Sequence, residues 1–265
     1  MNRTILIGSV LALAIAAGAA YYFLHGQEAA PAEETAAPAP AVTPAPSAAA
    51  AGEEHHPVPS SGAGEPFAGT LAESDGAMRQ ALDQVFGKGA LDALLIPHNL
   101  IRHLVATIVS LDGDPVAMRM RPLAHVPGLL VVDSDADHLV LSAQNAARYT
   151  PYVDLLNRAG AKPLAAIYLR FYPLFQSAYE ELGYKGQYFN DRLVKVIDHL
   201  LATPVVSGPI HLVRPKVLYE FEDSTLEERS SGQKLLIRMG VAQATVVKAW
   251  LAEIRKAVVA DAPQR

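Results

Sequence analysis

The chain contains no cysteine. Disulfides, a lipid-modified N-terminal cysteine and a structural zinc ion bound by thiolates are therefore excluded. An exported domain of this composition must be stabilised by its hydrophobic core alone, and about 190 residues are enough to supply one.

Charge is also sparse, because Asp, Glu, Lys and Arg make up only 18% of the residues. Six acidic residues and a single basic one, Arg3, precede position 71, so the part that follows is close to neutral and the chain's net charge of −5 comes from its N-terminal part. A neutral domain has no basic field that would attract a phosphate backbone. The sequence therefore predicts no nucleic-acid partner.

Familiar catalytic motifs are missing as well. The nine histidines form no H-E-x-x-H or comparable spacing, and there is neither a G-x-S-x-G elbow nor a phosphate-binding glycine loop. We accordingly predict no cofactor, no metal ligands and no assigned catalytic residue.

What the chain does have is an uninterrupted apolar run over residues 5–24. As a helix it would be about 30 Å long, which matches the hydrocarbon core of a bilayer. Arg3 precedes the run, and for some fifty positions after it the only titratable side chains are acidic residues and histidine. Because positive charge is retained on the cytoplasmic side, this distribution indicates a cytoplasmic N-terminus. We expect a single-pass protein of the inner (cytoplasmic) membrane, with its globular domain in the periplasm.

Two features of this run leave alternatives open. Ala17-Gly18-Ala19 fits a signal-peptide cleavage site, although the apolar run is longer than the usual signal core of about 7–15 residues. A stripe of small residues spaced by four could form a dimerisation face, so a homo-oligomer is an open alternative. The stripe consists of Gly8, Ala12, Ala16 and Ala20.

An Ala/Pro/Glu-rich stretch follows the span. Its composition cannot bury enough apolar surface to offset the entropy of ordering, and its Ala-Pro steps favour extended polyproline II. The expected organisation is a cytoplasmic tip (1–4), a transmembrane helix (5–24), a disordered tether (25–70), a globular domain (71–260) and a disordered tail (261–265).

Within the domain the apolar periodicity is mostly helical. Ser74 and Asp75 are expected to cap the first helix, and Asn99 precedes the second. Two apolar runs, 129–132 and 139–141, flank an Asp-rich segment and predict a β-hairpin. Short extended pieces are expected at 210–213 and 217–221.

The later helices follow from proline and glycine punctuation. Thr150-Pro151 resembles an N-cap with the first helical position, and Gly160 resembles a stop. A helix over 163–182 should kink or break at Pro173, because proline removes one helical hydrogen bond. Further helices are expected from 190 to before 204, over 226–239 and over 241–259. The predicted fold is mainly α: a compact helical domain with a small β-hairpin element.

Polar and aromatic residues gather in the middle of the domain and form the candidate binding site. Tyrosine rings could stack on a sugar or peptide while charged groups fix its polar atoms. A structural interpretation competes with this one: Asn190 would cap a helix, Asp191 would pair with Lys195, and tyrosines would bury their rings. The candidate residues are Tyr149, Tyr152, Arg170, Tyr188, Asn190, Asp191, Arg192, Asp198 and His199.

Several long peptides resemble a bacterial family known only as domain of unknown function 3014. They are Ala147–Val153, Phe171–Leu174, Tyr179–Tyr184, Tyr188–Leu193, Ile197–Pro204 and Pro215–Phe221. The resemblance extends over about residues 71–259 and implies an N-terminal anchor and an Ala/Pro-rich tether. It implies no activity, substrate or catalytic residue.

Three functional hypotheses follow. The first is a non-enzymatic envelope protein, anchored through residues 5–24, whose domain binds a protein or a cell-wall component at long reach. The second is an envelope hydrolase or transferase acting on wall glycan or peptide through Asp191, Arg192, Asp198 or His199. The third is a self-associating structural protein of the envelope.

Overall fold

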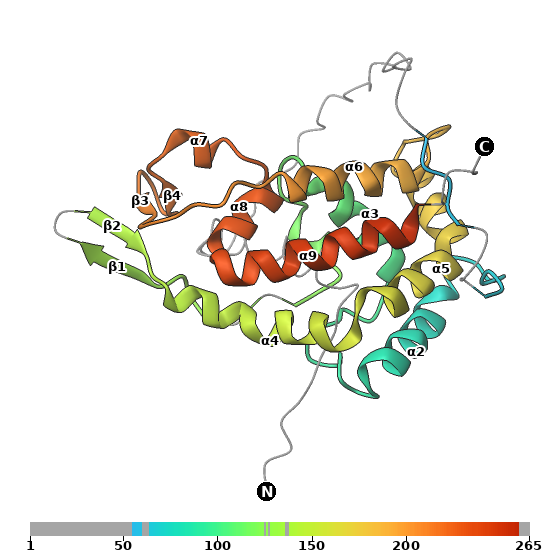
Figure 1. Ribbon diagram of the computed structural model, residues 1–265. Coiled ribbons are helices and arrows are strands. Elements are labelled where there is room, and N and C mark those ends of the chain that lie inside the picture. Colours follow the sequence, from blue (N-terminus) through green and yellow to red (C-terminus); the bar gives the residue numbers. More distant parts are fainter. Residues whose placement is uncertain (1–54, 60–63, 125, 127, 136–137, 260–265) are drawn as a thin grey trace, which may run out of the picture.

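The computed structural model describes residues 55–59, 64–124, 126, 128–135 and 138–259 (Figure 1). The expected membrane span and most of the tether lie outside these residues. Among the helices that are described, none is both long and apolar enough to cross a bilayer.

The described part is mainly helical, with a small antiparallel sheet. Its elements in chain order are α2 (Ser74–Phe86), α3 (Leu100–Ser110), the 3-10 turn η1 (Met118–Met120), β1 (Val132–Asp135), β2 (His138–Leu141), α4 (Gln144–Ala159), α5 (Ala161–Glu181), α6 (Phe189–Leu201), β3 (His211–Val213), β4 (Glu220–Phe221), α7 (Ser224–Glu227), α8 (Ser231–Arg238) and α9 (Val241–Val258).

Helix α9 lies in the middle of the helical layer and packs against α4, α5, α6 and α8 (Figure 1). Helix α5 also packs against α2 and α3. Aromatic rings fill the space between α5 and the start of α6: Phe175 stacks on Phe189 at 5.7 Å, and Tyr168 meets Phe175 edge to face. Buried aromatic side chains contribute the largest apolar areas per residue, so this cluster joins α5 to α6.

The sheet has the order β1-β2-β3-β4 and lies at one end of the molecule (Figure 1). Leu212 pairs with Leu139 on one side and Phe221 on the other. Because side chains alternate across a strand, these residues share one face. That face forms a second apolar cluster with Ile237 of α8. The predicted hairpin is confirmed, but its first strand is Val132–Asp135 and not 129–132, so Asp-rich residues expected in the turn lie in the strand. The extended pieces are confirmed as β3 and, over its last two residues only, as β4.

A helix start at Thr150-Pro151 and a kink or break at Pro173 were expected, and the start and the break are wrong. Helix α4 begins at Gln144 and runs through Pro151, so Thr150-Pro151 is not its start, although Gly160 does end it. Helix α5 likewise continues through Pro173 without a break. Tertiary packing overrides the local penalty in both, because buried side chains lie on each side of the proline, including Tyr149 and Tyr152 in α4.

The capping assignments also differ from those expected. Asp75 does not cap α2; its carboxylate accepts the backbone N–H groups of Asn99 and Leu100 at 2.7 and 2.8 Å and so caps α3. The helix expected over 226–239 is divided into α7 and α8, because Asp223 and Ser230 each cap a separate start.

Candidate functional site

The predicted site residues at the start of α6 do come together, and a segment of the chain itself lies against them. The two oxygens of Asp191 accept from His55 Nδ1 at 2.9 Å and from the His56 backbone N–H at 2.6 Å. The ring of His55 lies 4.3 Å from that of Tyr188, which is 54% exposed. Residues 55–59, part of the stretch expected as tether, are thereby placed on the helical domain (Figure 1).

Asn190 connects three parts of the fold at the same place. Its Nδ2 donates to the carbonyl oxygens of His56 at 2.7 Å and Val258 at 2.9 Å, and its Oδ1 accepts from the Tyr168 hydroxyl at 2.9 Å. Asn190 does not cap α6, because Tyr188 is at the N-cap position and the first helical N–H, that of Phe189, donates to Gln176 Oε1 at 2.8 Å. Burial of Asn190 with both amide atoms bonded gives it a structural role.

The remaining polar candidates of α6 each have a separate partner. Arg192 forms a fork with Asp112 just after α3, and Asp198 pairs with Arg255 of α9 at 2.6 and 2.9 Å. His199 Nε2 lies 2.8 Å from Ser230 Oγ. Within the described residues, the hydrogen bonds given above lead from these groups to three different partners and not to one another.

The candidates from α4 and α5 lie apart from this group. Tyr149 and Tyr152 are buried, and burial raises the pKa of both phenols. Arg170 is exposed on α5, with its guanidinium carbon 5.6 Å from the centre of the Phe171 ring. Two of the three candidate tyrosines are thus unavailable for stacking on a ligand.

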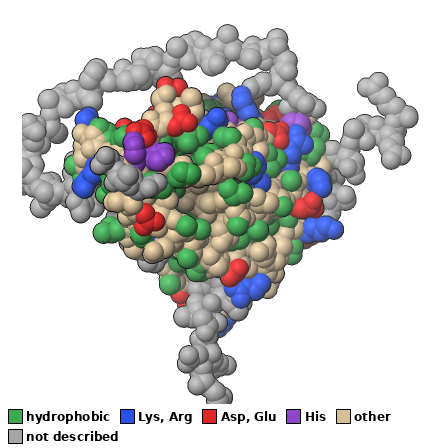
Figure 2. Space-filling view, turned by 60° about the vertical axis from the view of Figure 1, so that its left-hand side comes forward, with side chains coloured by type: hydrophobic (Ala, Val, Ile, Leu, Met, Phe, Trp, Pro, Cys, Tyr) green, Lys and Arg blue, Asp and Glu red, His purple; other side chains and the backbone are tan. Residues whose placement is uncertain are grey.

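A cavity of about 470 Å³ opens elsewhere, at the sheet end of the molecule. It lies between β1 and β2, the beginnings of α4 and α9, the end of α8 and the segment 203–210. Apolar side chains dominate its lining, and two of them, Val205 and Val241, are 65% and 48% exposed at its rim. Figure 2 brings this end forward and shows hydrophobic and uncharged atoms over the middle of the face, with charges mostly toward its margins.

Two basic side chains contribute to the cavity. Arg238 is buried, and its guanidinium lies 4.7 Å over the ring of Phe221. Burial lowers its pKa, an effect that the Glu227 carboxylate opposes, and among the described residues its buried Nη1 has no hydrogen-bond partner. Lys248 donates to the Thr203 carbonyl oxygen at 2.7 Å, close to the end of α6. The cavity therefore combines apolar walls with two basic groups and one carboxylate, that of Asp133.

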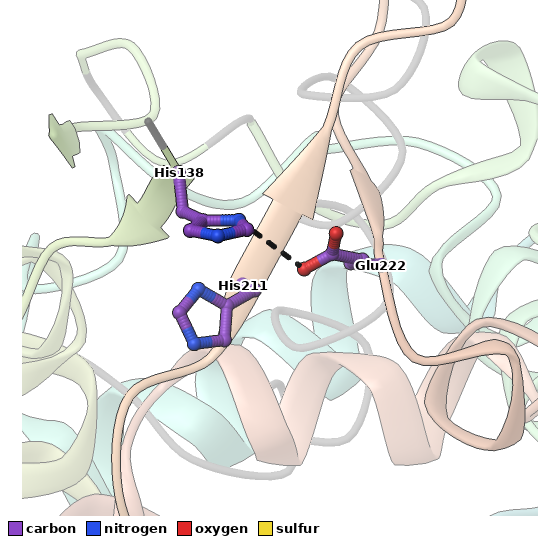
Figure 3. A group of neighbouring side chains, drawn as sticks. All are labelled: His138, His211 and Glu222. Carbon is purple, nitrogen blue, oxygen red and sulfur yellow. Dashed lines mark ion pairs between the residues drawn. The ribbon is translucent and has the colours of Figure 1, made fainter. Parts of the chain in front are cut away.

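One group of side chains within the described ranges could hold a metal ion. It consists of His138, His211 and Glu222, whose ligand atoms all lie within 4.8 Å of one another (Figure 3). Sequence spacing does not reveal it, because 73 residues separate the two histidines along the chain and strand pairing alone brings them together.

The described residues form a mainly helical domain with a small antiparallel sheet and a largely apolar cavity. The chain belongs to the family described as Protein of unknown function (DUF3014), whose profile matches residues 100–255. The resemblance found in the sequence is thereby confirmed, and the matched range includes the entire cavity lining. No curated protein and no solved structure matches the chain significantly.

Proposed function

We propose that this chain is a single-pass envelope protein, anchored in the inner membrane through residues 5–24, whose periplasmic domain binds a protein partner without catalysing a reaction. The cavity at the sheet end carries the proposal. A largely apolar hollow with a few polar groups and an exposed apolar rim is typical of a binding site. The membrane topology rests on the apolar run and its charge asymmetry.

The chemistry of the lining favours a peptide segment as the occupant. Apolar side chains of the peptide would cover Val205 and Val241, and a carboxylate of the peptide would complement the positive charge of Arg238 and Lys248. A glycan is the poorer match, because the lining contains no aromatic ring on which a sugar could stack.

Long reach would follow from the tether. Residues 55–59 lie against α6, so the free part would be residues 25–54. In polyproline II this length would extend on the order of 90 Å at about 3.1 Å per residue. Such a span would allow the domain to meet a partner held elsewhere in the envelope.

Site-specific photo-crosslinking in cells tests the binding surface. A photoreactive amino acid at Val205 should capture one protein reproducibly, whereas the same probe at Val217, which is 52% exposed but does not line the cavity, should not. Thr245→Trp, which fills the cavity from its exposed rim, should abolish the capture. Ala249→Trp, one turn further along the exposed side of α9, should leave it intact.

Other results would contradict the proposal. Capture of wall glycan from Val205 would replace the protein partner with a wall component, and capture of a second copy would indicate self-association. Equal capture in both tryptophan variants would remove the cavity from the binding surface. An alkaline phosphatase fusion at the C-terminus should be active, and an inactive, stably expressed fusion would refute the periplasmic location.

A further inference from the structure

The side chains of His138, His211 and Glu222 share the outer face of the small sheet. His211 pairs with Val140 of β2, and His138 precedes Val140 by two residues, so both histidines point to the same side. The backbone N–H of Glu222 donates to the His211 carbonyl oxygen at 3.0 Å, which places these two residues opposite each other. The apolar pairs of the inner face alternate with these positions, and the three polar side chains are therefore fixed together by register.

The distances suit a metal ion better than a simple ion pair. His138 Nδ1 lies 3.9 Å from Glu222 Oε2, and the two imidazole rings are 5.2 Å apart, nearly edge to face. Around a tetrahedral zinc ion with bonds of about 2.0–2.2 Å, neighbouring ligand atoms are about 3.4 Å apart. Small side-chain rotations would bring the three groups into that geometry (Figure 3).

His211 supplies a second, independent observation. Its Nδ1 is buried and has no hydrogen-bond partner among the described residues. A buried polar atom without a partner is unfavourable, and a metal ion would satisfy it. In Figure 3 one ring nitrogen of His211 faces the ring of His138, and the Glu222 carboxylate points toward the same space.

We propose that His138, His211 and Glu222 bind a divalent transition-metal ion of the zinc class. Two neutral imidazoles and one carboxylate are a ligand set typical of such ions, and the carboxylate supplies charge compensation. Three protein ligands leave the fourth tetrahedral position for water or an external donor. None of its three residues lines the proposed peptide site, although Val140, the strand partner of His211, does.

Metal titration of the full-length protein, purified in detergent without a histidine tag, tests the site. Calorimetry with Zn²⁺ should show saturable binding of one ion, and Co²⁺ should give the intense visible absorption of a four-coordinate complex. His138→Gln, His211→Gln and Glu222→Gln should each weaken Zn²⁺ binding by at least about tenfold. His98→Gln, which changes an exposed histidine outside the cluster, should bind as the unmodified protein does.

The variants also separate loss of the site from loss of the fold. Glu222→Gln keeps the side-chain size and the backbone hydrogen bond to His211, so its metal-free circular dichroism spectrum should be unchanged. Unaltered Zn²⁺ affinity in His211→Gln, or a weak octahedral Co²⁺ spectrum already in the unmodified protein, would overturn the site. Because the probe is the metal alone, this result does not depend on whether a peptide binds in the cavity.

Discussion

Arg192 offers a test of whether the polar residues of α6 stabilise the fold or remain available to a ligand. Its guanidinium donates to the two Asp112 oxygens at 2.5 and 2.8 Å and to the Val109 carbonyl oxygen at 2.7 Å. The Val109 carbonyl is in the last turn of α3, where carbonyl groups have no N–H donor within the helix. Arg192→Ala would therefore remove a connection between α6 and the end of α3.

The size of the effect follows from burial. Breaking a fully buried ion pair costs about 3–5 kcal/mol, whereas exposed pairs are worth about 0–1 kcal/mol. The two side chains here are 19% and 20% exposed, so water can reach Asp112 in part after the arginine is removed. We expect Arg192→Ala to lower the free energy of unfolding by about 2–3 kcal/mol, which corresponds to a fall in Tm of about 5–10 °C for a domain of this size.

A double-mutant cycle with Asp112→Ala isolates the pair. Urea unfolding of the two single variants and the double variant should give a coupling energy of about 1–2 kcal/mol. Arg119→Ala removes an exposed arginine elsewhere and should change stability by less than about 0.5 kcal/mol. A coupling energy below about 0.5 kcal/mol would refute the structural assignment and leave Arg192 free for a ligand.

Three further outcomes are expected. Burial lowers the pKa of His103, so the unfolded chain binds the proton more readily and the free energy of unfolding falls as the pH drops below about 6.5. Between pH 7.5 and pH 5.5, His103→Gln should therefore lose less stability in urea unfolding than the unmodified protein does, and an equal loss would contradict this. Gly232→Ala would place a Cβ atom 2.7 Å from the Leu111 carbonyl oxygen, and should destabilise by about 1–3 kcal/mol in thermal unfolding; an unchanged Tm would show that the backbone gives way. Asp191→Ala should release residues 55–59 and raise their hydrogen-exchange and proteolysis rates, whereas unchanged rates would show that other contacts hold the segment.

Local sequence patterns were sufficient to predict the elements whose structure depends on residues close together in the chain. The existence of the hairpin followed from two apolar runs around an Asp-rich segment, although that segment forms most of β1, and α6 followed from its apolar stripe. The start of α4 could not be predicted in this way, because Pro151 suggests a helix start while burial of Tyr149 and Tyr152 determines the outcome. Capping failed for a similar reason: Asp75 caps a helix 24 residues further along the chain.

The sites depended still more on tertiary structure. Grouping polar residues by sequence distance brought Tyr188, Asn190 and Asp191 together correctly, but it could not show that residues 55–59 lie against them. The cavity is formed by chain segments that extend from Asp133 to Lys248, and no local motif marks them. The histidine cluster likewise requires the register of three strands.

The attachment of residues 55–59 has a mechanical consequence. Asn190 binds the carbonyls of both His56 and Val258, so the incoming chain and the end of α9 meet at one pole of the domain (Figure 1). The cavity is at the other pole, about 27 Å away along the 18 residues of α9. A pull on the chain before His55 would therefore be applied at one end of the helical layer, and a partner held in the cavity would transmit it along α9 to the opposite end. If the preceding chain were a tether, the cavity would lie at the end of the domain away from the point of attachment and would face whatever that tether allows it to reach.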